Sequence, residues 1–176
     1  PVQYSTITEE HHAVRKAAGL FDIAHMGRLV FTGPDACGLL DSLITNDATQ
    51  LSVGQIRYSL ITNAQGGILD DVLAYRFDDH YLLVVNASNR EKIVAWIAQH
   101  QGSFNATVTD VTLQQSMLAI QGPCSVKILN GLAEIDVSEL KYYHGIETQI
   151  LGASAIVSRT GYTGEDGFEV IVPEER

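Results

Sequence analysis

Two adjacent carboxylates stand in the middle of an otherwise apolar stretch, and they constrain the fold more than any other feature of the chain. Residues 63–67 (Asn-Ala-Gln-Gly-Gly) are typical of a tight turn, and residues 67–77 have the aliphatic and aromatic content of a strand. Strand side chains alternate between two faces, so Asp70 and Asp71 must point in opposite directions. We expect one face to carry Leu69, Asp71, Leu73 and Tyr75, and the other to carry Asp70, Val72, Ala74 and Arg76.

This alternation sends one Asp toward water and the other toward an apolar layer. A carboxylate among apolar neighbours has either a raised pKa or a committed partner, and both are commoner at functional sites than elsewhere. The alternative is that both Asp residues belong to a solvated hairpin end. The residues alone give the two interpretations equal weight.

Composition narrows the classes of protein that the chain can belong to. Its 176 residues are 45% hydrophobic and 18% charged, which is typical of a globular protein. The net charge of −10 argues against nucleic acid as a partner, and no apolar run is long enough to span a membrane. Cys37 and Cys124 are far apart and are expected to be buried free thiols, and the histidines form no cluster that would hold a metal.

The periodicity of apolar residues and the positions of capping and turn residues predict alternating helices and short strands. Thr6 and Glu9 form a capping box for a helix over residues 5–18 with Gly19 as its stop, and residues 20–27 are expected to be irregular. Strands are expected at 28–32, 56–63, 67–77, 81–86, 106–111 and 169–172, and further helices at 35–44 and 87–100. This order predicts an α+β fold near the split-βαβ (ferredoxin-like) class, with two helices on one side of the sheet.

An internal echo indicates two related units. Residues 29–34 are matched by residues 118–123, and each segment ends in Gly-Pro before a helix. Gly66 precedes Asp71 by five residues, as Gly164 precedes Glu169, so both carboxylates could meet at one seam. We therefore expect an N-terminal helix and linker (1–27), a first α+β unit (28–112) and the start of a second (113–176). The alternative, that a strand followed by Gly-Pro and a helix is simply a common pattern, has equal weight.

Residues 158–169 contain three glycines at a spacing of three, Gly161, Gly164 and Gly167. This spacing predicts tight turns and a close approach of the backbone to a flat group or to another chain. The segment is no phosphate loop, because it lacks the Gly-Lys-[Ser/Thr] signature and carries acidic residues.

Several motifs in combination resemble the aminomethyltransferase (T-protein) family of the glycine cleavage system. They are residues 21–27 (FDIAHMG), 43–47 (LITND), 66–71 (GGILDD), 84–87 (VVNA) and 158–169 (SRTGYTGEDGFE). The resemblance covers essentially the whole chain, but the family's chains are roughly twice as long. It therefore implies a two-unit T-protein fold truncated before the C-terminal domain, and a fragment that is inactive alone. A chain that ends in the strand at 169–172 is also expected to leave that strand as an unpaired edge.

The resemblance implies a folate-dependent transfer. Lipoylated H-protein would carry an aminomethyl group, and tetrahydrofolate would take the one-carbon unit with release of ammonia; no metal is implied. By position, Asp71 matches the catalytic Asp, expected as a buried carboxylate, whereas Asp70 should matter much less. The folate pocket is matched by Met26, Tyr58, Tyr75, Asn86, Tyr142, Tyr162 and Glu169. A flat pterin edged with donors needs acceptors and aromatic walls of this kind.

Two alternatives stay open. One is another folate-binding relative, either a demethylase or an iron–sulfur assembly factor, and the other is an inactive module that only binds a partner. The resemblance implies the bacterial cytoplasm or the mitochondrial matrix, and the sequence does not distinguish the two. No export signal is visible at the first residues.

Overall fold

The computed structural model describes residues 3–174, which divide into two units. The continuous unit is His25–Gln114, and the divided unit combines the segment up to Ala24 with the segment from Gln115 onward. Within the described residues, every helix is too short or too polar to cross a membrane. Each unit is described by itself.

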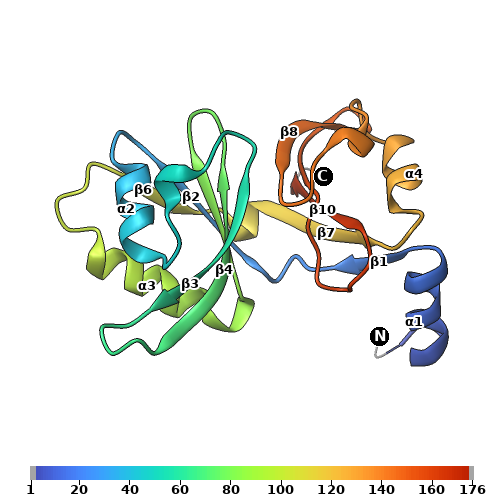
Figure 1. The fold of residues 1–176 in the computed structure, drawn as a ribbon, viewed down its shortest axis with the longest axis horizontal. Coiled ribbons are helices and arrows are strands. Elements are labelled where there is room, and N and C mark those ends of the chain that lie inside the picture. Colours follow the sequence, from blue (N-terminus) through green and yellow to red (C-terminus); the bar gives the residue numbers. More distant parts are fainter. Residues whose placement is uncertain (1–2, 175–176) are drawn as a thin grey trace. The chain divides into compact units, whose positions relative to one another are not determined.

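The continuous unit is a five-stranded antiparallel sheet with its helices on one face (Figure 1). Its elements are β2 (Gly27–Thr32), α2 (Ala36–Leu43), η1 (Ala48–Gln50), β3 (Ile56–Thr62), β4 (Ile68–Arg76), β5 (Tyr81–Val85), η2 (Ala87–Asn89), α3 (Arg90–His100), β6 (Thr107–Asp110) and η3 (Thr112–Gln114). The strand order is β3-β4-β5-β2-β6. This is the split-βαβ pattern with a meander of three strands where the simpler pattern has two, so the expected fold class is confirmed.

Apolar side chains from α2, α3 and the sheet form the core of this unit. Leu39 and Leu40 of α2 and Ile93 of α3 are completely buried against the sheet. Each complete burial of such a side chain contributes about 1.5–3 kcal/mol. The helices therefore fix the sheet face on which Val72 and Ala74 of β4 lie.

The divided unit repeats this strand order with a strand taken from the other end of the chain. Its elements are α1 (Ile7–Lys16), β1 (Gly19–Asp22), β7 (Gln115–Gln121), α4 (Ser125–Asn130), η4 (Val137–Glu139), β8 (Gly145–Ile150), β9 (Ala153–Ser158) and β10 (Gly167–Pro173). The order β8-β9-β10-β7-β1 matches β3-β4-β5-β2-β6 strand by strand. The expected relationship between two α+β units is thus present in the topology, with β1 in the place of β6.

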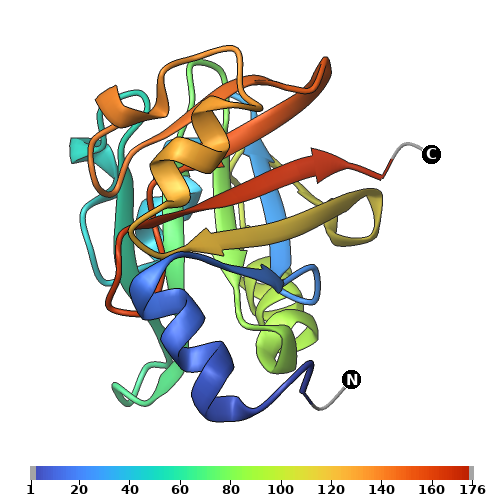
Figure 2. The same cartoon turned by 90° about the vertical axis from the view of Figure 1, so that its right-hand side faces the viewer.

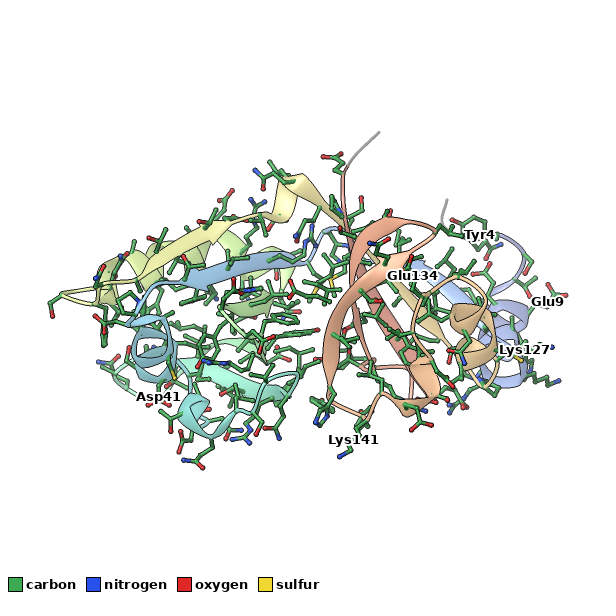
Figure 3. All side chains as sticks on the ribbon, turned by 90° about the horizontal axis from the view of Figure 1, so that it is seen from above. Tyr4, Glu9, Asp41, Lys127, Glu134 and Lys141 are labelled. Carbon is green, nitrogen blue, oxygen red and sulfur yellow. The ribbon has the colours of Figure 1, made fainter. Side chains whose placement is uncertain are left out.

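The loops that follow α2 and α4 match in detail as well. Asp41 Oδ1 accepts a hydrogen bond of 2.8 Å from the backbone N–H of Ala48 (Asp41 is labelled in Figure 3). Asn130 Oδ1 accepts one of 2.7 Å from the backbone N–H of Val137. The two acceptors stand seven residues before their donors, so the repeat extends beyond the strands.

The second sequence echo does not mark equivalent strands. Asp71 lies on β4, whereas Glu169 lies on β10, whose equivalent is β5. Because the two carboxylates also lie in different units, their meeting at one seam stays a prediction.

The N-terminal segment is more ordered than its sequence indicates. Thr6 Oγ1 accepts from the backbone N–H of Glu9 at 3.2 Å, so Thr6 caps the helix as predicted, and its hydroxyl donates to Glu9 Oε2 at 3.0 Å. The helix, however, ends at Lys16, and Gly19 is the first residue of β1 rather than a helix stop. Residues 23–26 are irregular as expected. For residues 20–22 that expectation is wrong, because residues 19–22 pair with β7, about 100 residues away, which no local pattern reveals.

The expectation of an unpaired edge at the last strand is also wrong. β10 pairs with β7 on one side and with β9 on the other (Figure 2, β10 in red and β7 in gold). Its second neighbour is supplied by the hairpin of β8 and β9, which the sequence reading did not identify. The edge strands of this sheet are β1 and β8.

The glycines of residues 161–167 make room for a side chain of the same unit. Gln121 is 1% exposed, and its Nε2 donates to Thr160 O at 3.0 Å. A Cβ added at Gly161 or Gly167 would overlap this side chain. Gly164 has a φ of 78°, which a turn requires. The close approach that the structure shows is thus to Gln121 of the same unit, and an approach to a flat ligand or to a second chain stays a prediction.

We expect Gly161→Ala to lower the free energy of unfolding by about 1–3 kcal/mol, because the new methyl group overpacks against Gln121. Urea denaturation measures this loss. In a Gln121→Ala background the same substitution should cost clearly less, since the obstructing side chain is gone. Equal costs in the two backgrounds would contradict the steric explanation.

Candidate functional site

A tight turn and a bulge prepare the strand that carries the two carboxylates. Asn63 Oδ1 accepts from the backbone N–H groups of Gln65 at 3.0 Å and Gly67 at 2.8 Å, and Gly66 has a φ of 79°. The β3–β4 pairing then runs Thr62 to Ile68 and Ile61 to Asp70, so Leu69 is skipped. A bulge of this kind leaves one residue outside the ladder and redirects the side chains around it.

The bulge changes which residues share a face. Leu69 packs against the core under the helices, although strict alternation had placed it with Asp71. From Asp70 onward the alternation holds, so Asp70 lies on the helix-covered face with Val72 and is 2% exposed. Asp71 is exposed. The expectation of Asp71 as the buried carboxylate is therefore wrong, and Asp70 is the buried one.

Asp71 is held by side chains from two neighbouring strands. Tyr58 of β3 donates from Oη to Asp71 Oδ2 at 3.2 Å, and Asn86, which follows β5, donates from Nδ2 to Asp71 Oδ1 at 2.9 Å. Tyr58 is opposite Leu73, so it reaches Asp71 along the diagonal of the same sheet face. Partial burial raises the pKa of Tyr58, and the charge and hydrogen bond of Asp71 raise it further. The structure thus brings together three of the predicted residues, Tyr58, Asp71 and Asn86.

Asp70 organises the other side of this cluster. Its Oδ2 accepts from the backbone N–H of Asn86 at 3.0 Å, and its Oδ1 accepts from Nδ2 of Asn86 at 2.9 Å and of Asn89 at 2.5 Å. Lys92 Nζ donates to Asn89 Oδ1 at 2.8 Å and to the bulge carbonyl of Leu69 at 2.6 Å.

The sequence reading missed Asp70, Asn89 and Lys92 as members of the site. Their signal is the spacing of three between Asn86, Asn89 and Lys92, which puts polar groups on one side of a helical start. A buried Asp in the neighbouring strand is a natural acceptor for that side.

Met26 and Tyr75 lie at different distances from this cluster along the sheet. Gly27 pairs with Val85, so Met26 and Asn86 are the next residues beyond the last pair of β2 and β5. Tyr75 is on the face of Asp71 but four residues further along β4, or about 13 Å at the usual rise of a strand. Tyr75 is 1% exposed and stacks on Phe77 with 6.3 Å between ring centroids. Met26 is therefore beside the cluster, and Tyr75 is not.

Glu169 is a buried carboxylate in the divided unit. It is 6% exposed, and Thr160 Oγ1 donates to its Oε2 at 2.5 Å. Ser158 Oγ lies 3.1 Å from Thr160 Oγ1 and donates to Glu169 O at 3.3 Å. Burial raises the pKa of Glu169, and the hydrogen bond from Thr160 opposes that shift only in part.

The raised pKa of Glu169 makes stability depend on pH. Glu169 binds its proton more tightly in the folded state than in the unfolded state. Its contribution to the free energy of unfolding is therefore fully present below about pH 4.5, its ordinary pKa, and is lost as the pH rises through the raised pKa. We expect Glu169→Gln to unfold at higher urea concentration than the unmodified protein at pH 7, and to lose that advantage near pH 4. A difference that does not change with pH would contradict the assignment.

Tyr142 and Tyr162 lie on two loops that Arg159 connects. Arg159 forms an ion pair with Asp166, with 2.6 Å between Nη2 and Oδ2, and its Nη1 donates to Leu140 O at 2.8 Å. Tyr142 is 62% exposed and Tyr162 is 66% exposed. Arg159 therefore joins the loop at residue 140 to the loop of residues 159–166, and both tyrosines are accessible.

The cluster around Asp71 is suited to binding a polar, partly aromatic molecule. The Asp71 carboxylate offers lone pairs to donors or to developing positive charge, and Tyr58 adds an aromatic surface. Within residues 3–174, no group of three or more His, Cys, Asp and Glu side chains is arranged to hold a metal ion. Cys37 and Cys124 are free and partly buried.

Comparison with known proteins shows the family of the chain. The model of the GCVT N-terminal domain family matches residues 1–176. The aminomethyltransferase of Moorella thermoacetica is 47% identical over 171 residues, covering 97% of this chain and 47% of that protein. The aminomethyltransferase of Lysinibacillus sphaericus is 43% identical over 178 residues, covering 99% of this chain and 48% of that protein. The chain thus spans about half the length of the curated relatives it matches.

Solved structures show the same fold. The glycine cleavage system aminomethyltransferase T from Bartonella henselae superposes with a TM-score of 0.86 at 36% identity, covering 94% of this chain and 44% of that chain. The heterotetrameric sarcosine oxidase from Corynebacterium sp. U-96 superposes with a TM-score of 0.66 at 16% identity, covering 94% of this chain and 82% of that chain, and shares the fold alone. By the match of the family model over its whole length and by the fold of both units, the chain belongs to the GCVT N-terminal domain family.

Proposed function

We propose that this chain provides the folate-binding part of a tetrahydrofolate-dependent aminomethyltransferase of the glycine cleavage system. The donor is the aminomethyl group on the lipoyl sulfur of H-protein. Tetrahydrofolate takes the carbon as methylenetetrahydrofolate, the nitrogen leaves as ammonia, and the lipoyl sulfur regains a proton. The observation that carries the proposal is the exposed Asp71 carboxylate, oriented by Tyr58 and Asn86, in a member of this family.

Asp71 has the chemistry that this transfer needs. The carbon that moves becomes electron-poor as its bond to sulfur or nitrogen breaks, and a carboxylate fixed beside it stabilises that positive charge. Asn86 and Tyr58 hold both carboxylate oxygens, so little reorientation is needed during the reaction. The same carboxylate can accept a hydrogen bond from an N–H group of the reduced pterin and so orient the attacking nitrogen.

Folate would be held by acceptors and aromatic walls. We propose Met26, Tyr58, Tyr75, Asn86, Tyr142, Tyr162 and Glu169 as the residues that bind folate. In the continuous unit the exposed ring of Tyr58 would supply an aromatic surface. In the divided unit Glu169 would accept hydrogen bonds from the donor edge of the pterin, and the exposed rings of Tyr142 and Tyr162 would supply aromatic surfaces. Tyr75 is 1% exposed and Glu169 is 6% exposed, so these two side chains would act from below the surface.

The test is a single-turnover assay with the protein at its natural length, aminomethylated H-protein and tetrahydrofolate. We expect methylenetetrahydrofolate and ammonia in equal amounts, with the carbon transfer depending on folate. Ammonia release at the same rate with and without tetrahydrofolate would overturn the proposal.

Glu169→Gln gives a separate test of binding. We expect it to weaken tetrahydrofolate binding by about 1–3 kcal/mol, because a charged acceptor is lost from a buried site. Isothermal titration calorimetry measures the change. Glu174→Gln, at an exposed position beyond β10, is the matched control and should bind as the unmodified protein does; equal affinity in all three proteins would contradict the role of Glu169.

A further inference from the structure

The bulge at Leu69 decides which of two adjacent carboxylates faces outward. A shift of one residue in the pairing of β3 and β4 would exchange the faces of Asp70 and Asp71. The skipped residue, Leu69, has a carbonyl outside the regular ladder, and Lys92 Nζ binds it at 2.6 Å. The strand register at the site therefore has a specific partner in α3.

A second set of contacts holds Asp70 on the inner face. Asn89 Nδ2 lies 2.5 Å from Asp70 Oδ1, and Lys92 Nζ lies 2.8 Å from Asn89 Oδ1, so one ammonium group supports both the bulge and the amide. Asn86 then links the two carboxylates, because its Nδ2 lies 2.9 Å from Asp70 Oδ1 and 2.9 Å from Asp71 Oδ1.

We propose that Lys92 and Asn89 are positioning residues that lock the bulge at Leu69 and thereby keep Asp71 facing outward against Tyr58. Neither residue is assigned to the binding of substrate. Lys92 acts through Leu69 and Asn89, and Asn89 acts through Asp70 and Asn86. The consequence for turnover rests on the proposed function, whereas the positioning itself does not.

Tyr58 reports on the position of Asp71 without any assay of activity. The charged group that faces its hydroxyl is Asp71; Arg57, its neighbour in the strand, donates from Nη1 to Asp47 O at 3.1 Å. The titration of Tyr58 can be followed in the 176-residue chain by NMR with tyrosine labelled at the ring carbon that bears oxygen. The Tyr58→Phe variant identifies the resonance, and Asp71→Asn gives the pKa of Tyr58 without the carboxylate.

We expect Lys92→Met to lower the pKa of Tyr58 at least halfway to the value found in Asp71→Asn. The sign is decisive. Removing a cation should, by charge alone, raise the pKa of a nearby phenol, whereas an Asp71 that turns away from Tyr58 lowers it. Asn89→Ala should lower the pKa in the same direction without changing any charge.

The controls separate position from charge and from general damage. Lys92→Arg keeps a donor of the same charge and should retain most of the raised pKa. Lys127→Met removes an exposed lysine of α4 (Figure 3) and should leave the resonance of Tyr58 unchanged. A pKa of Tyr58 that rises or stays constant in both Lys92→Met and Asn89→Ala would overturn the proposal.

Turnover gives the second readout, in the protein at its natural length. We expect Lys92→Met and Asn89→Ala to lower kcat about tenfold with little change in KM for tetrahydrofolate, because the reacting group and not the binding surface is displaced. If the pKa of Tyr58 falls in the variants while the unmodified protein transfers no carbon, the positioning role is supported and the proposed function is contradicted. If the pKa of Tyr58 does not fall in either variant, the positioning role is contradicted whatever the activity.

Discussion

Asp71→Asn is expected to reduce aminomethyl transfer at least about a hundredfold while leaving the fold intact. The substitution keeps the shape of the side chain but removes the negative charge that would oppose the developing positive charge on the transferred carbon. Asp71 is exposed, so its charge contributes little to folding. Single-turnover rates with aminomethylated H-protein and tetrahydrofolate measure the effect, and urea denaturation checks that the stability is unchanged.

Asp78→Asn is the matched control for this experiment. It removes one negative charge from an exposed turn of the same unit, away from the cluster, and should leave the rate within about twofold. A rate for Asp71→Asn close to that of the control would show that the carboxylate takes no part in the transfer.

Asp70→Ala is expected to lower the free energy of unfolding by about 3–4 kcal/mol. Asp70 is 2% exposed and accepts three hydrogen bonds, from Asn86 N, Asn86 Nδ2 and Asn89 Nδ2. Asn86 Nδ2 still donates to Asp71 without it, but the backbone N–H of Asn86 and Nδ2 of Asn89 lose their acceptor, which is costly inside the protein. The sequence alone assigned Asp70 the minor role of the pair. The structure changes that expectation, because the inner carboxylate ties β4 to the start of α3.

Asp71→Ala is the comparison for this loss. It removes the same side chain from the next residue of the same strand, on the exposed face, and should cost less than about 1 kcal/mol. Chemical denaturation of both variants under the same conditions gives the difference. Similar losses at the two positions would contradict the assignment of Asp70 to the inner face.

Local patterns were sufficient to predict the elements of the continuous unit. The strands expected at 28–32, 56–63, 67–77 and 81–86 are β2, β3, β4 and β5 with shifts of one residue at their ends. Alternation also predicted correctly that Asp70 and Asp71 face opposite sides. Both inferences need only the side-chain period of a strand and the turn residues between strands.

The failures have a different physical origin. The bulge at Leu69 depends on the pairing with β3 and on Lys92 of α3, so strand periodicity cannot predict it. The resemblance predicts Asp71 as the catalytic residue and as a buried carboxylate, but the layer of helices buries Asp70 instead. Glycine is needed at positions 161 and 167 because the side chain of Gln121 packs against them. Gln121 lies on a strand about 40 residues earlier, so a local sequence pattern cannot predict this contact.

The pairing of β1 with β7 sets an order of events during protein synthesis. The segment Gly19–Asp22 leaves the ribosome first, but its partner residues Leu118–Gln121 follow about 100 residues later. At about 5–20 residues per second, β1 lacks its partner for roughly 5–20 s. In that interval all of the continuous unit is made, so its sheet can close before β1 is paired. Only four residues wait in this way, and a strand so short offers little edge for pairing with another chain.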